Sequence, residues 1–290
     1  MKLLSFGEII WDVFPDAAHI GGAPLNFAAH AAMQGVDSYI LSGIGRDELA
    51  DRALVEVSAL GVNTALVSRC DRPTGQCIVT LDENAVPSYN VLSDTAYDLI
   101  ALPDAKSLEG FDVLAFGTLA LRGAHNKETL SAVMQSASFG EIFTDLNIRA
   151  PFYSDESINF CLSHATIVKI SDEELPIVTK AALGRTLSVE DAARALCERF
   201  SQIKIIIITK GRDGSYAYVA KDGAEYSCPT DGSKAISTVG AGDSFGATFL
   251  SQYFGGRSIP ECLRIASRVS GFVVSREGAV PKYDINEFIK

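Results

Sequence analysis

The sequence predicts one α/β domain built on a mostly parallel β-sheet that helices cover. Short apolar runs typical of buried strands alternate with segments whose apolar residues recur at a helical period of about 3.6 residues. The chain has 290 residues, of which 47% are hydrophobic, and α/β folds of this length commonly form one core. We therefore interpret residues 1–290 as a single domain with a small elaboration.

The predicted elements follow one another in strand–helix order. Strand-like runs lie at 3–10, 39–44, 113–116, 141–144, 166–168 and 203–208, and helical patterns at 47–60, 127–137 and 189–200. Residues at the helix ends support this interpretation. Pro24 suits a first helical position and Gly35 a helix stop, while Asp47 and Ser188 suit N-caps.

Residues 74–91 break this alternation, because two β-rich runs flank a turn-like stretch at 82–87 with no helix between them. The segment 11–20 is also extended. We expect residues of about 11–22 and 73–95 to form a small sheet, a lid over a site at the strand ends of the core. An exposed edge on that lid would favour pairing with a second copy of the chain as a homodimer.

Composition argues against several kinds of partner. The formal net charge is -11, which disfavours binding to nucleic acid or to an anionic membrane. The six cysteines form no C-x-x-C pair and the four histidines lack metal-ligand spacing, so we expect a reduced, cytoplasmic setting. The most apolar run, 205–208, is far too short to span a membrane.

The strongest signal for chemistry is Gly240-Ala-Gly-Asp243, which opens a helical pattern. Small residues let backbone N–H groups approach an anion at a helix N-terminus, where Asp243 could accept a proton from an attacking hydroxyl. The alternative is an ordinary helix start. A dinucleotide fingerprint would need glycine at Phe245, and no P-loop occurs.

Polar residues near other predicted strand ends offer further ligand contacts. Asp12 and Asn26 could hold sugar hydroxyls, although for each residue alone a solvent-facing aspartate or an ordinary first helical turn is the simpler explanation. Arg149 follows a predicted strand and could bind phosphate or substrate oxygens, or form a surface ion pair. Ser171 and Glu174 have the spacing of a capping box, a role compatible with orienting the waters of a metal ion.

Taken together, these residues resemble the PfkB, or ribokinase-like, carbohydrate kinases, and most closely their bacterial fructokinase branch. The resemblance spans nearly the whole chain. Its landmarks are Gly7-Glu-Ile-Ile-Trp-Asp12, Gly21-Gly-Ala-Pro-Leu-Asn26, Pro73-Thr-Gly75, Asp145-Leu-Asn-Ile-Arg149, Lys169-Ile-Ser-Asp-Glu-Glu174, Thr209-Lys-Gly211, Gly240-Ala-Gly-Asp243 and Arg276-Glu-Gly-Ala279.

The resemblance implies a Rossmann-like three-layer core with a small β lid, and an enzyme that uses ATP and Mg²⁺ to phosphorylate a primary hydroxyl of a small sugar. It implies that Asp243 is the base and that the amides of Ala241, Gly242 and Asp243, after Gly240, form an anion hole. The other roles it implies are sugar contacts at Asp12, Gly22 and Asn26, a substrate or phosphate contact at Arg149, a water-mediated magnesium contact at Glu174, and nucleotide contacts at Thr209, Gly211 and Gly214.

Two departures from the family pattern limit what can be carried over. Many relatives have aspartate, which helps to hold a monovalent cation, where this chain has Ser237, and asparagine where it has Ser171. Fructose is the preferred substrate by resemblance, with 2-keto-3-deoxygluconate and a ribose-type sugar as alternatives. A sugar- or nucleotide-binding regulator that has lost catalysis is the alternative of another class. A nicotinamide-dependent dehydrogenase lacks the glycine fingerprint.

Overall fold

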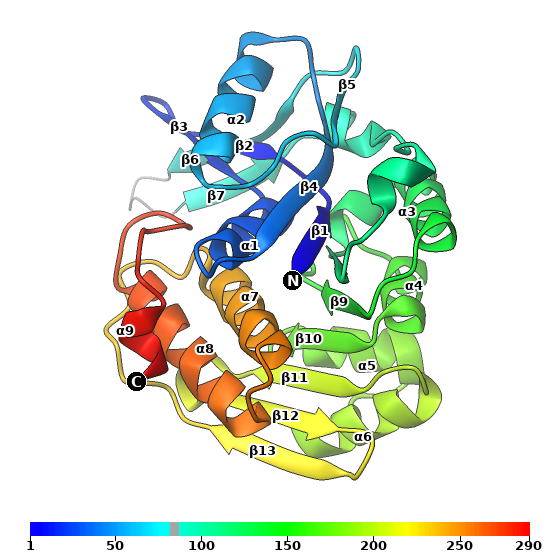
Figure 1. Ribbon diagram of the computed structural model, residues 1–290, viewed down its shortest axis with the longest axis vertical. Coiled ribbons are helices and arrows are strands. Elements are labelled where there is room, and N and C mark those ends of the chain that lie inside the picture. Colours follow the sequence, from blue (N-terminus) through cyan, green and yellow to red (C-terminus); the bar gives the residue numbers. More distant parts are fainter. Residues whose placement is uncertain (82–86) are drawn as a thin grey trace.

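The computed structural model describes residues 1–81 and 87–290, which form two β-sheets flanked by helices (Figure 1). The larger sheet has nine strands in the spatial order β13-β12-β11-β10-β9-β8-β1-β4-β5. In chain order these strands are β1 (Lys2–Phe6), β4 (Asp37–Ile44), β5 (Val67–Arg69), β8 (Val113–Phe116), β9 (Glu141–Asp145), β10 (Ile167–Ser171), β11 (Ile205–Thr209), β12 (Ser215–Val219) and β13 (Ala224–Cys228).

The prediction of a mostly parallel sheet is confirmed. Neighbouring strands from β5 to β11 run parallel, whereas β12 and β13 are antiparallel to their neighbours. Strand β1 lies between β4 and β8, so the chain builds the sheet outward on both sides of its first strand. Ligands of open α/β sheets bind outside the carboxyl ends of the strands near such a reversal.

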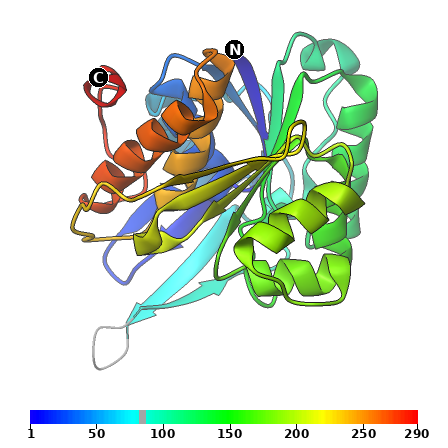
Figure 2. The same ribbon diagram turned by 90° about the horizontal axis from the view of Figure 1, so that it is seen from below.

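Helices cover both faces of the large sheet, giving three layers (Figure 2). One face carries α1 (Ala23–Ala32), α7 (Ala241–Phe254) and α8 (Ile259–Val274), and the other carries α3 (Ala124–Ser136), α4 (Asp155–His164), α5 (Leu175–Leu183) and α6 (Val189–Arg199). Successive strand residues point to opposite faces. Leu3 of β1 accordingly packs with residues of α1 and α7, while Leu4 packs with residues of α3 to α6.

The small sheet stands apart from the large one, and its hairpin projects away from the core (Figure 2). It has the order β3 (Ala18–Gly21), β2 (Ile10–Val13), β6 (Gly75–Leu81) and β7 (Pro87–Val91), with β2 and β6 parallel and the outer pairs antiparallel. The predicted turn at 82–87 lies, up to residue 86, outside the described residues. The inner strands bury Ile10 and Cys77 against Tyr97 and Leu119 of the core.

The remaining helical segments of the described chain are short or peripheral. Helix α2 (Glu48–Ala59) packs on Trp11 of the small sheet and on α1. The others are α9 (Asn286–Ile289) and the 3-10 turns η1 (Ala96–Leu99), η2 (Ala105–Leu108), η3 (Leu119–Leu121) and η4 (Gly211–Asp213). Within the described residues, no helix is both long enough and apolar enough to cross a bilayer.

One predicted strand is wrong in its extent. The run 3–10 is divided between β1 of the large sheet and β2 of the small sheet, and the break falls at Gly7, whose φ is 151°. A side chain at Gly7 would collide with the ring of Pro24, so the chain can leave β1 here because the residue is glycine. This break places the residues after β1 at the junction between the two sheets.

Helix ends match the sequence signals closely. Asp47 caps α2 by accepting from the amide of Ala50 at 2.9 Å, and Ser188 caps α6. Pro24 lies at the second rather than the first position of α1. Helix α3 begins three residues before its predicted start at 127.

Candidate active site

The candidate base lies where α7 begins. Gly240 is the N-cap of this helix, with φ 78°, and a side chain there would collide with the carbonyl oxygen of Ala279. Asp243 follows in the first turn and is only 7% exposed. The first amides of a helix have no carbonyl partner inside it. Ala241 nevertheless donates to Thr238 at 3.2 Å in the preceding turn, which leaves the amides of Gly242 and Asp243 as the donors best placed for an anion.

Asp243 is held by a residue from α1. Asn26 donates from Nδ2 to Oδ2 of Asp243 at 2.8 Å, which joins two residues 217 positions apart. Burial and the nearby charge of Asp145 raise the pKa of Asp243 to about 6, against the opposing effects of Asn26, Lys169 and Arg149. A carboxyl with this pKa is mostly ionised at pH 7 but is a stronger base than an exposed aspartate.

A buried ion pair lies beside this carboxylate. Lys169 of β10 donates from Nζ to Oδ2 of Asp145 of β9 at 2.7 Å, and the lysine side chain is 4% exposed. Burial lowers the pKa of Lys169, but attraction to Asp145 and Glu174 outweighs burial and leaves the pKa raised. A side chain on Gly242 would lie 3.1 Å from Nζ of Lys169. The glycine therefore lets the ammonium group approach the start of α7.

The sequence reasoning gave neither member of this pair a role. Its signal was a lysine inside the apolar run Ile167–Ile170, since an ammonium group is rarely buried without a partner. The predicted strand 166–168 is shorter than β10, which continues through Lys169 to Ser171. Two parallel neighbouring strands supply the two charges at the same edge of the sheet.

Glu174 and Ser171 exchange the hydrogen bonds of the predicted capping box, but in the turn before α5, whose N-cap is Glu174 itself, and Glu174 also joins two loops. Its Oε2 accepts from the amide and the hydroxyl of Ser171 at 2.8 and 2.9 Å, and its Oε1 accepts from the amide of Ile148 at 2.6 Å. An ionised carboxylate has about four lone-pair sites. The three bonds therefore leave room for one further donor, such as a water.

The residues predicted to contact sugar come from different elements. Asp12 lies on β2, opposite His19 of β3 and Cys77 of β6, and burial raises its pKa. Arg149 is exposed after β9, yet its charge opposes the rise in the pKa of both Asp12 and Asp243. The small sheet and the core therefore bring these groups within electrostatic reach of one another.

Gly22 joins the small sheet to α1 as the N-cap of that helix. A side chain on Gly22 would lie 2.5 Å from the carbonyl oxygen of Glu8. This close approach explains why a glycine stands here and brings the backbone of Gly22 next to the residues that follow β1.

Sequence reasoning missed Glu8, which lies between β1 and β2 and is 4% exposed. Burial raises its pKa to about 7, with a further contribution from the charge of Asp243. Both carboxyl groups line a cavity of about 30 Å³, together with Asp145 and Asn147. That volume holds about one or two waters. The signal in the sequence was an acidic residue inside the apolar run 3–10.

The predicted nucleotide contacts lie at the far side of the sheet from β1. Thr209 ends β11, Gly211 begins η4, and Gly214 precedes β12. A side chain on Gly214 would collide with the carbonyl oxygen of Cys228, so the tight link between β11 and β12 is enough to explain this glycine. Among the described residues, no cluster of three or more His, Cys, Asp or Glu side chains is arranged to hold a metal ion.

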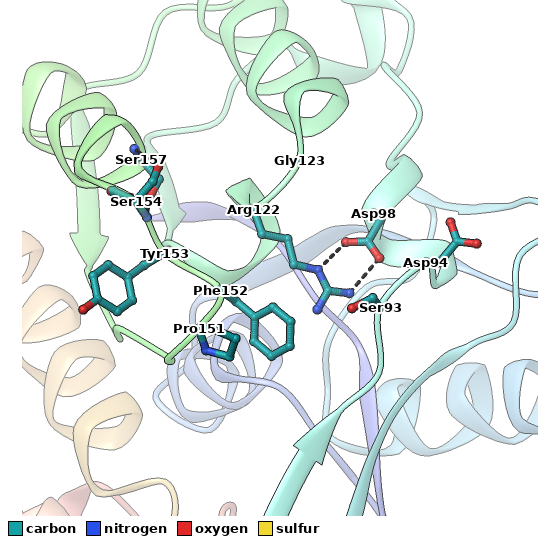
Figure 3. A pocket seen from close by; sticks show the side chains of 10 residues that line it. All are labelled: Ser93, Asp94, Asp98, Arg122, Gly123, Pro151, Phe152, Tyr153, Ser154 and Ser157. Atoms are coloured by element: carbon teal, nitrogen blue, oxygen red, sulfur yellow. Dashed lines mark hydrogen bonds and ion pairs between the residues drawn. The ribbon is translucent and has the colours of Figure 1, made fainter.

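A second pocket, of about 410 Å³, opens beside the start of α3 (Figure 3). Arg122 lies against it and donates from Nε and Nη2 to the two carboxylate oxygens of Asp98, each at 2.7 Å. Its guanidinium group also stacks on the rings of Tyr97 and Phe152. The charge of Arg122 is therefore neutralised by Asp98, and its guanidinium group is held between the two rings. These contacts stabilise the loops that carry Asp98 and Phe152. The pocket is lined by Ser93, Asp94, Asp98, Arg122, Gly123, Pro151, Phe152, Tyr153, Ser154 and Ser157.

The chain is similar in sequence and in fold to carbohydrate kinases. The family model described as pfkB family carbohydrate kinase matches residues 6–286. A fructokinase of Rhizobium leguminosarum bv. trifolii is 27% identical over 267 residues, covering 86% of this chain and 78% of the relative. A fructokinase double mutant from Vibrio cholerae O395, in fructose, ADP and potassium ion bound form, has a TM-score of 0.85 at 20% identity. The match covers 100% of this chain and 98% of the fructokinase chain.

A putative ribokinase II from E. coli, in complex with ATP and Mg²⁺, has a TM-score of 0.84 at 19% identity, with 99% of this chain and 98% of that chain covered. These structural likenesses confirm the predicted fold, a ribokinase-like three-layer core with a second, smaller sheet.

Proposed function

This chain belongs to the pfkB family of carbohydrate kinases, and on that premise we propose that it transfers the γ-phosphoryl group of ATP to a primary hydroxyl of fructose. The observation that carries the mechanism is the buried Asp243 at the start of α7, held by Asn26 at 2.8 Å. The similarity to the Rhizobium fructokinase supports the choice of sugar, as does the structural likeness to a fructokinase with fructose and ADP bound.

We assign Asp243 as the general base. Its carboxylate would accept the proton of the sugar hydroxyl while the hydroxyl oxygen attacks the γ-phosphorus, and ADP would leave with the electron pair of the broken P–O bond. The amides of Gly242 and Asp243, with the nearby ammonium group of Lys169, would stabilise charge on the transferring group. Placing these groups before the reaction contributes most of the catalysis in such transfers.

The sugar would lie between the small sheet and the core. Asp12 accepts hydroxyl hydrogens, and the backbone of Gly22 lies beside Glu8 at the same junction. Asn26 uses Nδ2 to hold Asp243, so its Oδ1 is the atom left for a sugar hydroxyl. Arg149, exposed on the loop after β9, would bind substrate or phosphate oxygens.

We place the nucleotide along Thr209, Gly211 and Gly214 at the ends of β11 and η4. The residues near the phosphates fit a magnesium–phosphate complex, because Mg²⁺ prefers oxygen ligands and keeps several waters, and Glu174 has room for one more donor. When bound, Mg²⁺ neutralises phosphate charge. Ser237 accepts from the amide of Val239 at 3.2 Å and adds no charge, so the proposal includes no monovalent cation.

The small sheet is proposed to be a lid that excludes water from the transfer, formed by about 11–22 and 73–95 of a single domain. Its outer strands are β3 and β7. Unpaired strand edges favour strand addition, so we also propose that two copies pair through this sheet. Light scattering of the purified chain would give twice the monomer mass if this is correct.

A coupled assay of ADP release over ketohexoses, aldohexoses, ribose, nucleosides and keto-deoxy acids tests the proposal. We expect the highest kcat/KM with fructose. Preference for 2-keto-3-deoxygluconate or ribose would overturn the choice of sugar and keep the reaction. Saturable sugar or nucleotide binding without ADP formation on any acceptor would instead identify a regulator that has lost catalysis, against the complete Gly240–Asp243 turn.

A further inference from the structure

A row of polar side chains on α1 and in the turn that follows it faces α7 and the C-terminal segment. Asn26 and His30 lie four residues apart on one face of α1, and Gln34 follows four residues later, just beyond the helix, which ends at Ala32. Asn26 binds Asp243, and Gln34 donates from Nε2 to Oγ1 of Thr248 in α7 at 2.8 Å. His30 lies between them and is fully buried. A buried imidazole needs hydrogen-bond partners, and its partners show what it holds.

The bonds of His30 fix its protonation. One ring nitrogen, Nε2, lies 3.0 Å from the carbonyl oxygen of Ala279, and Nδ1 lies 3.1 Å from the hydroxyl of Tyr283. A carbonyl oxygen only accepts, so Nε2 carries the proton and Nδ1 accepts from Tyr283. Burial lowers the pKa of His30 to about 4, which keeps the ring neutral near pH 7.

The carbonyl of Ala279 packs against the start of α7. A side chain at Gly240 would collide with this oxygen, so glycine is what allows the close approach. Gly240 has no side chain with which to cap α7, so the packing of neighbouring residues is left to position the first turn. One helix, α1, therefore fixes Asp243 through Asn26 and the backbone next to Gly240 through His30.

We propose that His30 is a positioning residue for phosphoryl transfer. It holds the carbonyl of Ala279 against Gly240 and so sets the first turn of α7, whose amides and carboxylate act on the transferring group, in register with Asn26. His30 itself contacts neither substrate. This inference rests on the proposed function, because the register matters only if the first turn of α7 takes part in transfer.

Three variants test this role. His30→Leu removes both hydrogen bonds at similar volume, and His30→Gln keeps an N–H donor for the carbonyl of Ala279. As a matched control, His164→Leu removes a histidine of α4, on the opposite face of the sheet, that bonds the carbonyl of Phe160. Each variant is assayed well below its Tm, with kcat, KM for both substrates and the sugar Kd measured separately.

We expect His30→Leu to lower kcat by about 10- to 100-fold, the size of effect that a misplacement near 1 Å produces. The sugar Kd should stay within about 2-fold of wild type, while His30→Gln and the control keep kcat within about 3-fold. A lower Tm with unchanged kcat in His30→Leu would overturn the proposal, since His30 would then serve stability alone. An equal loss of kcat in His30→Gln and in His30→Leu would also overturn the proposal, since the donor to the carbonyl of Ala279 would then not matter.

A readout that needs no turnover separates this inference from the proposed function. Backbone amide chemical shifts of Gly240 and Asp243 should move in His30→Leu and stay near wild type in His30→Gln and His164→Leu. If the wild-type chain phosphorylated none of the sugars, the proposed function would fail, yet these shifts would still decide the positioning. Unmoved shifts in His30→Leu would overturn the inference whatever the activity.

Discussion

Replacing Asn26 by leucine should shift the pH dependence of phosphorylation. In the wild type, burial beside Asp145 raises the pKa of Asp243 to about 6, and the hydrogen bond from Asn26 opposes this rise. A general base acts only when ionised. The kcat/KM of the wild type should therefore fall as the pH drops through about 6, and the midpoint of that fall should rise when the donor is removed.

The size of the shift follows from the bond that is lost. A hydrogen bond to a charged group contributes about 1.5–3 kcal/mol, and about 1.4 kcal/mol corresponds to one pKa unit, so the midpoint should rise by about 1 to 2 pH units. At pH 6 about half of wild-type Asp243 is ionised, against about 1–10% in Asn26→Leu. The smaller ionised fraction of Asp243 alone then lowers kcat/KM at about pH 6 by about 5- to 50-fold.

The assay is a profile of kcat/KM between about pH 5 and pH 9 for both proteins. Asn26 is also a proposed sugar contact, so its replacement will also lower kcat/KM at every pH. The pH at which kcat/KM falls to half of its maximum still reports the pKa of the base. Glu8 has a pKa of about 7 in the same cavity, and Glu8→Gln removes that second titration. A midpoint that stays near 6 in Asn26→Leu, or a fall that disappears in Glu8→Gln, would show that Asp243 does not set this pH dependence.

Two further predictions concern stability. Because the pKa of Asp243 is raised from 3.8 to about 6, its ionised form destabilises the folded state above pH 6 by about 3 kcal/mol. Asp243→Asn should increase the free energy of unfolding at pH 7 by up to that amount, and the gain should vanish as the pH falls from 6 towards 4. Urea titrations at pH 7 and at pH 4 measure this gain. An equal gain at pH 7 and at pH 4 would show that the ionisation of Asp243 is not its cause. Lys169→Met leaves Asp145, whose side chain is 13% exposed, without its partner and should lower the free energy of unfolding by about 3–5 kcal/mol. Combining Lys169→Met with Asp145→Leu should recover much of this loss. No recovery in the double variant would show that the loss is not electrostatic.

Local patterns were sufficient to predict six neighbouring strands of the large sheet, from β11 to β4, and most of its helices. Each buried strand such as β11 is a short apolar run, and caps such as Asp47 sit where the helical period begins. The strands β5, β12 and β13 were not predicted. Strand β13 is half exposed and its polar residues weaken the strand pattern, and β5 has only three residues, whereas β12 has the pattern of a buried strand and was missed. The division of β1 from β2 depends on the packing of Gly7 against Pro24, which local sequence does not reveal.

The candidate site shows the same contrast. Asp243 and Asn26 could be proposed from their motifs, but their direct bond joins residues 217 positions apart. Lys169 and Glu8 were missed, because their importance comes from burial next to other charges, and burial is a property of the assembled sheet. His30 gave no signal in the sequence, since its partners Ala279 and Tyr283 come from the C-terminal segment.

The central claim is that Asp243 is the base of a sugar kinase, and the most direct test is the turnover of Asp243→Asn with the sugar that the wild type phosphorylates best. The side chain keeps its size, and its oxygen can still accept from Asn26. We predict that kcat falls by about 10²- to 10⁴-fold, while calorimetry shows sugar and ATP still bound. Turnover near the wild-type rate in the folded variant would exclude Asp243 as the base.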